Sequence, residues 1–462
     1  MASMSSAAEP SHPVVFTTQT PYPLPSQKFM IPTSWKRYQL SQLVNKALSL
    51  LKPVPFDFLV RGEILRATLG EWCAEKGIGE EETLEIEYFE SVMPPQKMST
   101  LPHEDWVSSV SCQISSYFLT ASYDGSIRTF DYSQQLLHTS TPHSAPITCI
   151  CIVPSSSPDG HIIASASHDL TARLTKLTLS TSDSPDFTPR TEPLASLHLH
   201  TAPVSSIAAS PSGAHLLTSS WDSFIGLWDA AIPDSDEVPL EDVQPHTDRK
   251  KRRKFTHDDE PRPKRKAPVG VLKSHTARVS RVVFTRGGDA AAYSCGFDST
   301  VRSWDVENSV CTNTITAASK PFLDLAVTQS GNTVLAASTD RTISQYDLRA
   351  ATSSTATPSL ATLAHPATPS CIAVPPPAAQ SSPPSEPVSS SEHQLLSGAY
   401  DGVVRLWDLR SVRGAVTSFK VWEGNQGGKV LTLDWARGIV GVGGEGGVEV
   451  WRVGQGEHAF LS

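Results

Sequence analysis

The sequence lacks the features of a membrane-spanning, secreted or catalytic protein. It has no run of about 18 apolar residues, so no transmembrane helix is expected. The first ten residues contain no apolar stretch and include Glu9, which argues against a secretory signal. Its seven cysteines form no CxxC pair, so a zinc site or a disulfide framework is not expected, and a reducing compartment is. No phosphate-binding loop, metal-ligand cluster or single Ser/His/Asp triad is visible. We therefore expect a non-enzymatic protein with no cofactor, metal or membrane partner of its own.

Charge of either sign is also scarce. Charged residues make up 18% of the chain, and 38 basic against 47 acidic residues give a net charge of −9, so a uniformly basic surface is excluded. Hydrophobic residues, at 39%, are sufficient for packed cores. At about 150 residues per domain, the 462 residues predict roughly three domains.

One pattern recurs seven times: an acidic residue is followed six positions later by an aromatic residue. The five complete copies begin at Asp124, Asp222, Asp298, Asp340 and Asp401. Two copies are degenerate. In one, Thr175 replaces the aromatic residue six positions after Asp169; in the other, Glu445 replaces the aspartate six positions before Trp451. The shortest intervals between successive acids are 42, 44 and 45 residues, with short alternating apolar runs between them. This period predicts a mostly β chain with a seven-bladed WD-repeat propeller at residues 96–455.

Each repeat contains further polar residues at matching positions. The complete set in the fourth repeat is His275, Ser294, Asp298 and Trp304. We expect the aspartate to accept hydrogen bonds from the turn between the second and third strands, and the other three to extend that network. A Ser/His/Asp set also resembles hydrolase machinery. Because it recurs in repeat after repeat, we interpret it as structural.

The last repeat is short, since only eleven residues follow Trp451. We therefore predict that residues 97–101, which precede the first blade, supply the outer strand of the seventh. An unpaired edge would otherwise invite aggregation. At the position four residues after the acid we also expect four exposed arginines as candidate partner contacts: Arg128, Arg173, Arg302 and Arg405.

Residues 13–95 contain none of this repeat, and residues 1–12 are expected to be disordered. The predicted elements are strands at 14–18 and 29–32, a helix capped by Thr33 or Ser34, strands at 56–60 and 63–65, a helical turn at 68–72 and a strand at 83–88. This order predicts an α+β β-grasp domain. The run from Leu59 to Tyr88 resembles ubiquitin, but the chain continues past it, so we expect a binding module and no conjugated modifier.

The loop before the last of these strands is acidic. It contains Glu80, Glu81 and Glu82, and no lysine or arginine lies between Glu80 and Glu90. One interpretation is a solvated acidic surface. The other is a site for a cationic or metal-bearing partner, because a partner's Mg²⁺ with an open position prefers hard oxygen ligands.

Two inserts interrupt the repeats. Residues 232–268, expected between blades three and four, begin acidic and become strongly basic; the basic residues are Arg249, Lys250, Lys251, Arg252, Arg253, Lys254, Lys264, Arg265 and Lys266. Such a run indicates nuclear localisation, a phosphate-contacting RNA arm or a solvated loop, and nuclear import is favoured. Residues 375–392, expected between the first two strands of blade six, are rich in Pro and Ser and predict a disordered loop.

A β-grasp domain fused to a WD propeller is unusual. Together with the segment Lys52-Pro-Val-Pro-Phe-Asp-Phe-Leu59, it resembles the family of WD-repeat subunits of the PeBoW complex, which contains Pescadillo and Block of proliferation. The resemblance implies an assembly factor for the large (60S) ribosomal subunit, needed for pre-rRNA processing in the nucleolus and nucleoplasm, with mostly indirect rRNA contact. It implies that the propeller binds Block of proliferation. The ubiquitin-like domain would dock on the Mg²⁺ site of the AAA+ ATPase midasin for release from pre-60S particles.

By the same resemblance, Glu81 supplies the carboxylate to the midasin-bound metal, with Glu80 and Glu82 as the alternative registers. Two other identities stay open. Notchless has the same N-terminal domain type and the same ATPase, but carries eight repeats where this sequence has seven. A ubiquitin-ligase substrate adaptor could also combine a propeller with a ubiquitin-like domain.

Overall fold

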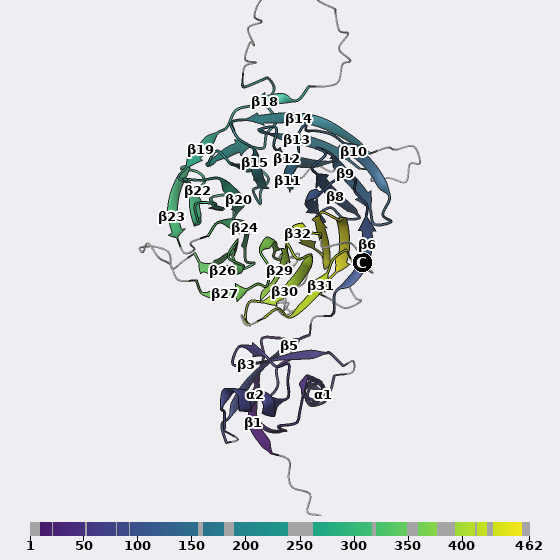
Figure 1. Cartoon of the computed structure of the whole chain (residues 1–462), viewed down its shortest axis with the longest axis vertical. Helices are drawn as coiled ribbons and strands as arrows, with labels where there is room; N and C mark the ends of the chain where they lie inside the picture. The colour runs from purple at the N-terminus through teal and green to yellow at the C-terminus, as the bar shows by residue number, and fades with distance from the viewer. Residues whose placement is uncertain are drawn as a thin grey trace, which may run out of the picture.

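The computed structural model describes residues 10–454 except 21, 51–52, 80, 92, 156–159, 180–188, 239–261, 317–319, 349–358, 377–392, 412–413 and 423–427. Figure 1 shows a ring of small sheets, with a smaller domain below it on the side of β30 and β31. The smaller domain is N-terminal, and the chain passes from it directly into the ring. Neither of the two helices among the described residues is long and apolar enough to cross a membrane.

The N-terminal domain is a β-grasp, as predicted. Its elements are β1 (Ser11–Thr17), β2 (Lys28–Pro32), α1 (Arg37–Leu48), β3 (Phe56–Val60), β4 (Glu63–Ile64), α2 (Leu69–Lys76) and β5 (Leu84–Glu90). The sheet order is β2-β1-β5-β3-β4, with β1 and β5 parallel at its centre. Ser11 and His12 pair with β2, although we expected disorder through residue 12. His12 is buried there, so burial against the sheet explains the order.

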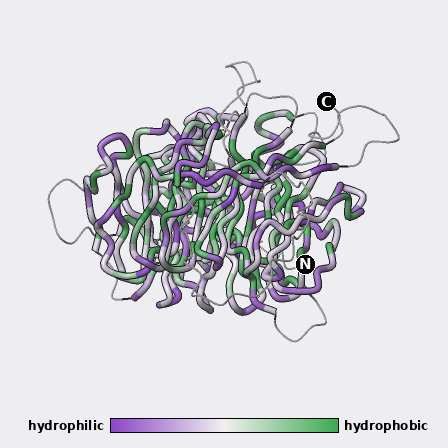
Figure 2. Tube along the Cα trace, turned by 90° about the horizontal axis from the view of Figure 1, so that it is seen from above, coloured by the Kyte–Doolittle hydropathy of each residue, from purple (hydrophilic) through white to green (hydrophobic). Residues whose placement is uncertain are grey.

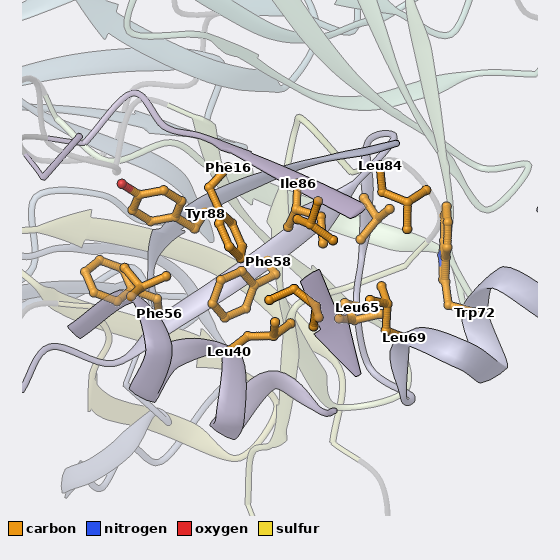
Figure 3. Close-up of a cluster of buried hydrophobic side chains, with 14 of the residues drawn as sticks. Phe16, Leu40, Phe56, Phe58, Leu65, Leu69, Trp72, Leu84, Ile86 and Tyr88 are labelled. Atoms are coloured by element: carbon orange, nitrogen blue, oxygen red, sulfur yellow. The ribbon is translucent and has the colours of Figure 1, made fainter. Parts of the chain in front are cut away.

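Alternate residues of the central strands build the core of this domain. Phe56, Phe58, Ile86 and Tyr88 point to the helix side and pack with Leu40 of α1 (Figure 3). The ring of Tyr88 lies edge-on to that of Phe56, with 5.5 Å between the ring centroids. These aromatic residues explain why the Pro-Phe-Asp-Phe-Leu segment is a strand, because its alternation matches the period of two.

The predicted N-cap of α1 is wrong. The helix begins at Arg37 after Lys36, because the segment before it is bound to the start of α2. The Gly70 amide donates to the Thr33 carbonyl at 2.8 Å, and a Cβ at Gly70 would lie 2.9 Å from that of Thr33. Glycine is therefore required at position 70, and Thr33 is not available as a helix cap.

Seven sheets form the ring among the described residues. Blade one contains β7 (Val107–Ser111), β8 (Tyr117–Ser122), β9 (Ile127–Asp131) and β10 (Leu136–Ser140). Blade two contains β11 (Ile147–Val153), β12 (His161–Ser167), β13 (Thr171–Thr178) and β14 (Arg190–His198). Blade three contains β15 (Val204–Ala209), β16 (His215–Ser220), β17 (Phe224–Asp229) and β19 (Gly270–Lys273).

The remaining blades follow the same plan of four antiparallel strands. Blade four contains β20 (Val279–Phe284), β21 (Ala291–Gly296), β22 (Thr300–Asp305) and β23 (Val310–Thr316). Blade five contains β24 (Phe322–Val327), β25 (Thr333–Ser338), β26 (Thr342–Asp347) and β27 (Ala361–Ala364). Blade six contains β28 (Pro369–Ala373), β29 (Gln394–Ala399), β30 (Val403–Asp408) and β31 (Thr417–Lys420). Blade seven contains β32 (Val430–Ala436), β33 (Ile439–Gly444) and β34 (Gly447–Arg452).

The predicted outer strand of blade seven is confirmed. β6 (Gln96–Leu101) pairs antiparallel with β34, so the strand that precedes blade one completes blade seven. Every pair of neighbouring blades shares a cluster of buried apolar side chains, and one such cluster joins blades seven and one. Figure 2 shows hydrophobic stretches running through the ring. The propeller is therefore held together by burial between blades.

The first insert lies elsewhere than predicted. The outer strand of blade three, β19, pairs with β17 and follows the insert, so the insert lies within blade three and not between blades three and four. A short strand near its end, β18 (Lys264–Lys266), pairs parallel with β14 of blade two. The second insert lies between β28 and β29 as predicted, and residues 377–392, where we expected a disordered loop, lie outside the described residues.

Candidate docking sites

The repeat aspartates serve the turns between the second and third strands. Six of them accept the backbone N–H two residues further along the chain, at 2.8–3.2 Å: Asp124, Asp169, Asp222, Asp298, Asp340 and Asp401. Glu445 of blade seven differs, because it accepts the Lys429 amide at 3.1 Å. This geometry satisfies turn donors that would otherwise lack partners, which is a structural role.

In blade four the structure brings the complete set together. His275 Nδ1 lies 2.8 Å from Asp298 Oδ2, and His275 Nε2 lies 2.6 Å from Ser294 Oγ. Trp304 Nε1 donates to the same Ser294 Oγ at 2.7 Å. Burial raises the pKa of Asp298, but the hydrogen bond and charge of His275 outweigh it and the pKa falls to about 2. Ser294, His275 and Trp304 are all buried, so no substrate reaches a nucleophile here.

The four arginines that we expected to be exposed are not, and that prediction is wrong. Arg302 is buried, and Arg128 and Arg405 keep only 14% and 11% of their side chains exposed. Three of them form an ion pair with the aspartate of their own blade: Arg128 lies 2.5 Å from Asp124, Arg405 lies 2.6 Å from Asp401, and Arg302 lies 3.7 Å from Asp298. Arg173 is partly buried as well. These side chains are therefore less accessible than we expected.

The glutamates of the acidic loop before β5 differ in their partners. Glu81 and Glu82 are both exposed, whereas Glu80 lies outside the described residues. Glu82 is bound to Arg61 of the β3–β4 turn by a hydrogen-bonded ion pair. Among the described residues, Glu81 has no hydrogen-bond or ion-pair partner. Glu81 thus offers an unoccupied carboxylate beside a neighbour that is already engaged.

A different feature, not anticipated from the sequence, lies on the face of the ring that carries the turns between second and third strands. The ring of His168 lies 5.3 Å from that of Trp221, centroid to centroid. The Arg278 guanidinium then lies 5.2 Å from the Trp221 ring and 4.0 Å from the Phe297 ring. Trp221 is 44% exposed, and Arg278 is exposed too. We name this set the first ladder; it crosses blades two, three and four.

A second ladder of the same kind crosses blades one, seven and six. Trp106 lies 5.9 Å from Tyr123 by ring centroids, and Lys429 Nζ lies 5.9 Å from the rings of both Trp106 and Tyr400. Trp106 and Tyr400 are each 44% exposed. Because strands within a blade alternate in direction, the start of the first strand and the end of the second lie at one end of the blade. The two ladders therefore share one face of the ring.

A sequence signal for these ladders exists. The residue directly before the repeat aspartate is aromatic or histidine in five of the six aspartate-bearing repeats: Tyr123, His168, Trp221, Phe297 and Tyr400. Tyr123, His168 and Phe297 are partly buried, whereas Trp221 and Tyr400 are exposed aromatic residues. Exposed aromatic residues are typical of binding surfaces.

The base of the first insert is fastened by its own acidic and basic residues. The Arg265 amide donates to Asp236 Oδ1 at 2.8 Å, and the Arg262 guanidinium donates to Asp236 Oδ2 at 3.0 Å. Lys266 is buried, and its ammonium donates to the Ala231 carbonyl. Of the nine basic residues predicted as a nuclear localisation signal, Lys266 is therefore buried in the fold. Residues 249–254 lie outside the described residues.

Known family models match both domains of the chain. Residues 13–73 match the NLE (NUC135) domain model, and residues 95–131, 134–175, 191–229, 266–305 and 359–408 match the WD domain, G-beta repeat model. The fold and these matches define the class: a WD-repeat propeller protein with an N-terminal NLE domain.

Individual relatives narrow the class. Ribosome biogenesis protein YTM1 of Laccaria bicolor is 60% identical over 449 residues, which cover 96% of this chain and 95% of that protein. The protein of the same name from Coprinopsis cinerea is 54% identical over 453 residues, 97% and 96% of the two chains. That of Saccharomyces cerevisiae is 32% identical over 443 residues, 91% and 92% of the two chains. The chain belongs to the YTM1 family of ribosome biogenesis proteins.

Proposed function

We propose that the chain is a non-catalytic assembly factor for the 60S ribosomal subunit, acting in the nucleolus and nucleoplasm. Its propeller binds the Block-of-proliferation subunit in a complex with Pescadillo. Its ubiquitin-like domain docks through Glu81 on the Mg²⁺ site of midasin, and the ATPase then releases the factor from the pre-60S particle. The observation that carries the docking proposal is the exposed carboxylate of Glu81, which has no partner among the described residues.

The chemistry of this docking is the completion of a coordination shell. Mg²⁺ takes hard oxygen ligands in an octahedral arrangement and commonly retains an exchangeable position. An exposed carboxylate in a loop can enter that position without a conformational change in the domain. Glu82 would first have to give up its ion pair with Arg61, which disfavours it as the ligand. The metal belongs to the partner; this chain supplies only the oxygen.

The corresponding substitution is Glu81→Ala. We expect it to leave folding and assembly with the Block-of-proliferation subunit intact, and to make the protein accumulate on pre-60S particles. The measurement is the amount of the factor on affinity-purified pre-60S particles. Glu82→Ala is the matched control and should release normally. Normal release of the Glu81→Ala protein from these particles would contradict the docking proposal.

For the propeller, the two ladders support a protein-binding surface. Trp, Tyr and Arg side chains often contribute most of the binding energy of an interface. The Arg278 guanidinium lies 4.0 Å from the centre of the Phe297 ring, whereas the Lys429 ammonium lies 5.9 Å from that of Trp106 and pairs with Glu445 at 3.1 Å. Such a surface fits a partner that presents carboxylates and apolar side chains. We therefore assign the Block-of-proliferation subunit to this face.

Truncation of the first ladder tests that assignment. The double substitution Trp221→Ala and Arg278→Ala removes an exposed indole and its stacked cation, so we expect loss of about 2–4 kcal/mol of binding energy. Titration of the purified partner subunit in a calorimeter measures it. The matched control is Tyr132→Ala, which removes a 41% exposed aromatic residue at the opposite end of blade one. Equal affinities of the ladder variant and the wild type would reject this face.

The basic run 249–254 is proposed as the nuclear import signal. The contacts at the base of the insert support the proposal. Asp236 binds Arg262 and Arg265, and β18 pairs with β14, so both ends of the insert are held at the outer rim of blades two and three. A reporter fused to residues 248–267 should accumulate in the nucleus. The same fusion with residues 249–254 changed to alanine should not. If both fusions show the same distribution, this run is not the signal.

A further inference from the structure

Two apolar residues on the helix-free face of the ubiquitin-like sheet are buried. Phe56, Phe58 and Val60 of β3 belong to the core on the helix side. Leu59 lies between them in sequence and so points to the other face, where α1 and α2 do not lie. Leu59 is nevertheless only 2% exposed, and so is Phe89 of β5. This face also carries Glu85 and Glu87, so the burial of Leu59 and Phe89 on it requires a local cover.

The cover is blade six of the propeller. Arg410, just after β30, places its guanidinium 4.5 Å from the centre of the Phe89 ring and 3.4 Å from Glu87 Oε1. A Cβ on Gly62 would lie 3.6 Å from the Arg410 carbonyl oxygen, so the β3–β4 turn also approaches this segment. Arg66 donates a hydrogen bond to the Ala415 carbonyl. These contacts lie between β30 and β31, which border the domain in Figure 1.

Arg410 is held in place from within the propeller. Its Nε and Nη2 donate to the two carboxylate oxygens of Asp408, at 3.0 Å and 2.7 Å, and Asp408 is 3% exposed. Burial lowers the pKa of Arg410, but Asp408 and then Glu87 outweigh it and raise the pKa above its usual value. A planar guanidinium that is hydrogen-bonded at two points loses little further conformational entropy when another domain binds to it. The propeller side of the contact is thus preorganised.

We infer that the ubiquitin-like domain is docked on blade six in one orientation, and that Arg410 is the positioning residue of this contact. Bound to Asp408 on one side, Arg410 meets Phe89 and Glu87 on the other. The inference rests on the proposed function in one respect: a fixed domain presents the Glu81 loop to the ATPase at a set place relative to the partner-bound propeller.

The contact also gives an applied force a second route into the ring. The chain leaves β5 at Glu90 and enters β6 at Gln96, and within the part of the chain that the structure describes β6 pairs only with β34. Without the Arg410 contact, a pull on the domain would act on β6 only, the strand that completes blade seven. With it, part of the pull passes to blade six.

The test is the distance between the two domains in the full-length protein. Spin labels on genetically encoded ketone residues at Gln42 in α1 and at Val310 in β23 leave the seven native cysteines unlabelled. We expect one narrow distance peak for the wild type and its loss in Arg410→Ala. Arg262→Ala removes another surface ion pair far from this contact, and should keep the peak.

Glu87→Gln provides a second variant that changes the ubiquitin-like side only and should broaden the same peak. Thermal unfolding of each variant checks that both domains stay folded. A broad wild-type distribution, or an unchanged peak in Arg410→Ala, would overturn the inference. The measurement needs no ATPase, so it can fail while Glu81-dependent docking holds, and the reverse is equally possible.

Discussion

At the scale of single residues, the propeller uses one histidine position in two ways. In blades two, three and four the histidine lies between a carboxylate and a hydroxyl, as with His200, which is 3.0 Å from Asp222 and 2.8 Å from Thr218. In blade six, the Arg405 guanidinium donates a hydrogen bond to the Asp401 carboxylate. His365 Nδ1 lies instead 2.7 Å from the Ala367 carbonyl oxygen. The blade-six histidine is therefore buried without an anionic partner.

This difference predicts acid sensitivity that begins in blade six. Burial, with a contribution from the Arg405 charge, lowers the pKa of His365 to about 4. In the unfolded chain a histidine takes up its proton near pH 6.5, at about the usual pKa. The unfolded state then binds more protons than the folded state between pH 6.5 and 4, so stability is lost as the pH falls through this window.

His365→Gln removes the titrating group. We expect a lower unfolding temperature at pH 7, because the hydrogen bond from Ser397 is weakened, and a smaller further decrease between pH 6.5 and 4 than in the wild type. Thermal unfolding across this pH range measures both effects. The same decrease in both proteins would show that His365 does not contribute.

At the scale of elements, the six residues of β6 contribute strongly to the stability of the ring. It completes blade seven, and the ammonium of Lys97 lies 2.5 Å from Glu449, whose side chain is 2% exposed. Glu449 also accepts the indole N–H of Trp451 at 3.1 Å and the Trp422 amide at 3.2 Å. Loss of the Lys97 cation would leave a buried carboxylate that is only partly compensated.

Deletion of residues 96–102 should therefore unfold the ring at lower temperature, with a loss above about 4 kcal/mol. The point substitution Lys97→Met keeps the strand and should cost about 3 kcal/mol. Chemical denaturation measures both. Lys420→Met, on the exposed outer strand of blade six, is the control and should stay within about 0.5 kcal/mol of the wild type. A deletion variant as stable as the wild type would refute the closing role of β6.

Elements also show how far sequence reasoning reaches. Spacing found the seven blades and β6, because a repeat must satisfy the same turn donors each time and a ring must have its last strand. It misplaced the first insert, because β19 is four residues long and its pairing with β17 spans that insert. Sequence reasoning missed the ion pairs of Arg128 and Arg405 with the aspartate four residues earlier. Whether such an arginine reaches the aspartate depends on the shape of the turn between them, which the spacing alone does not give. The Arg410 contact joins residues 321 and 323 positions apart, and no local pattern encodes it.

At the scale of the whole molecule, the two domains divide the work. The propeller offers a wide face with two ladders of stacked aromatic and cationic side chains, which suits a stable partner. We propose that the ubiquitin-like domain docks through the exposed Glu81 carboxylate, which has no partner among the described residues, in a contact made and broken during each round of release. We infer that the Arg410 contact with Phe89 and Glu87 holds the two domains in one orientation.

The most direct test of this account is Mg²⁺-dependent binding of the purified full-length protein to the metal-site domain of midasin. The wild type and Glu82→Ala should bind in Mg²⁺, and chelation of the metal should abolish binding of both. Glu81→Ala should fail to bind in Mg²⁺ while unfolding at the temperature of the wild type. Binding of Glu81→Ala with the affinity of the wild type, or binding of the wild type that survives chelation, would contradict the proposal that the Glu81 carboxylate completes the metal site.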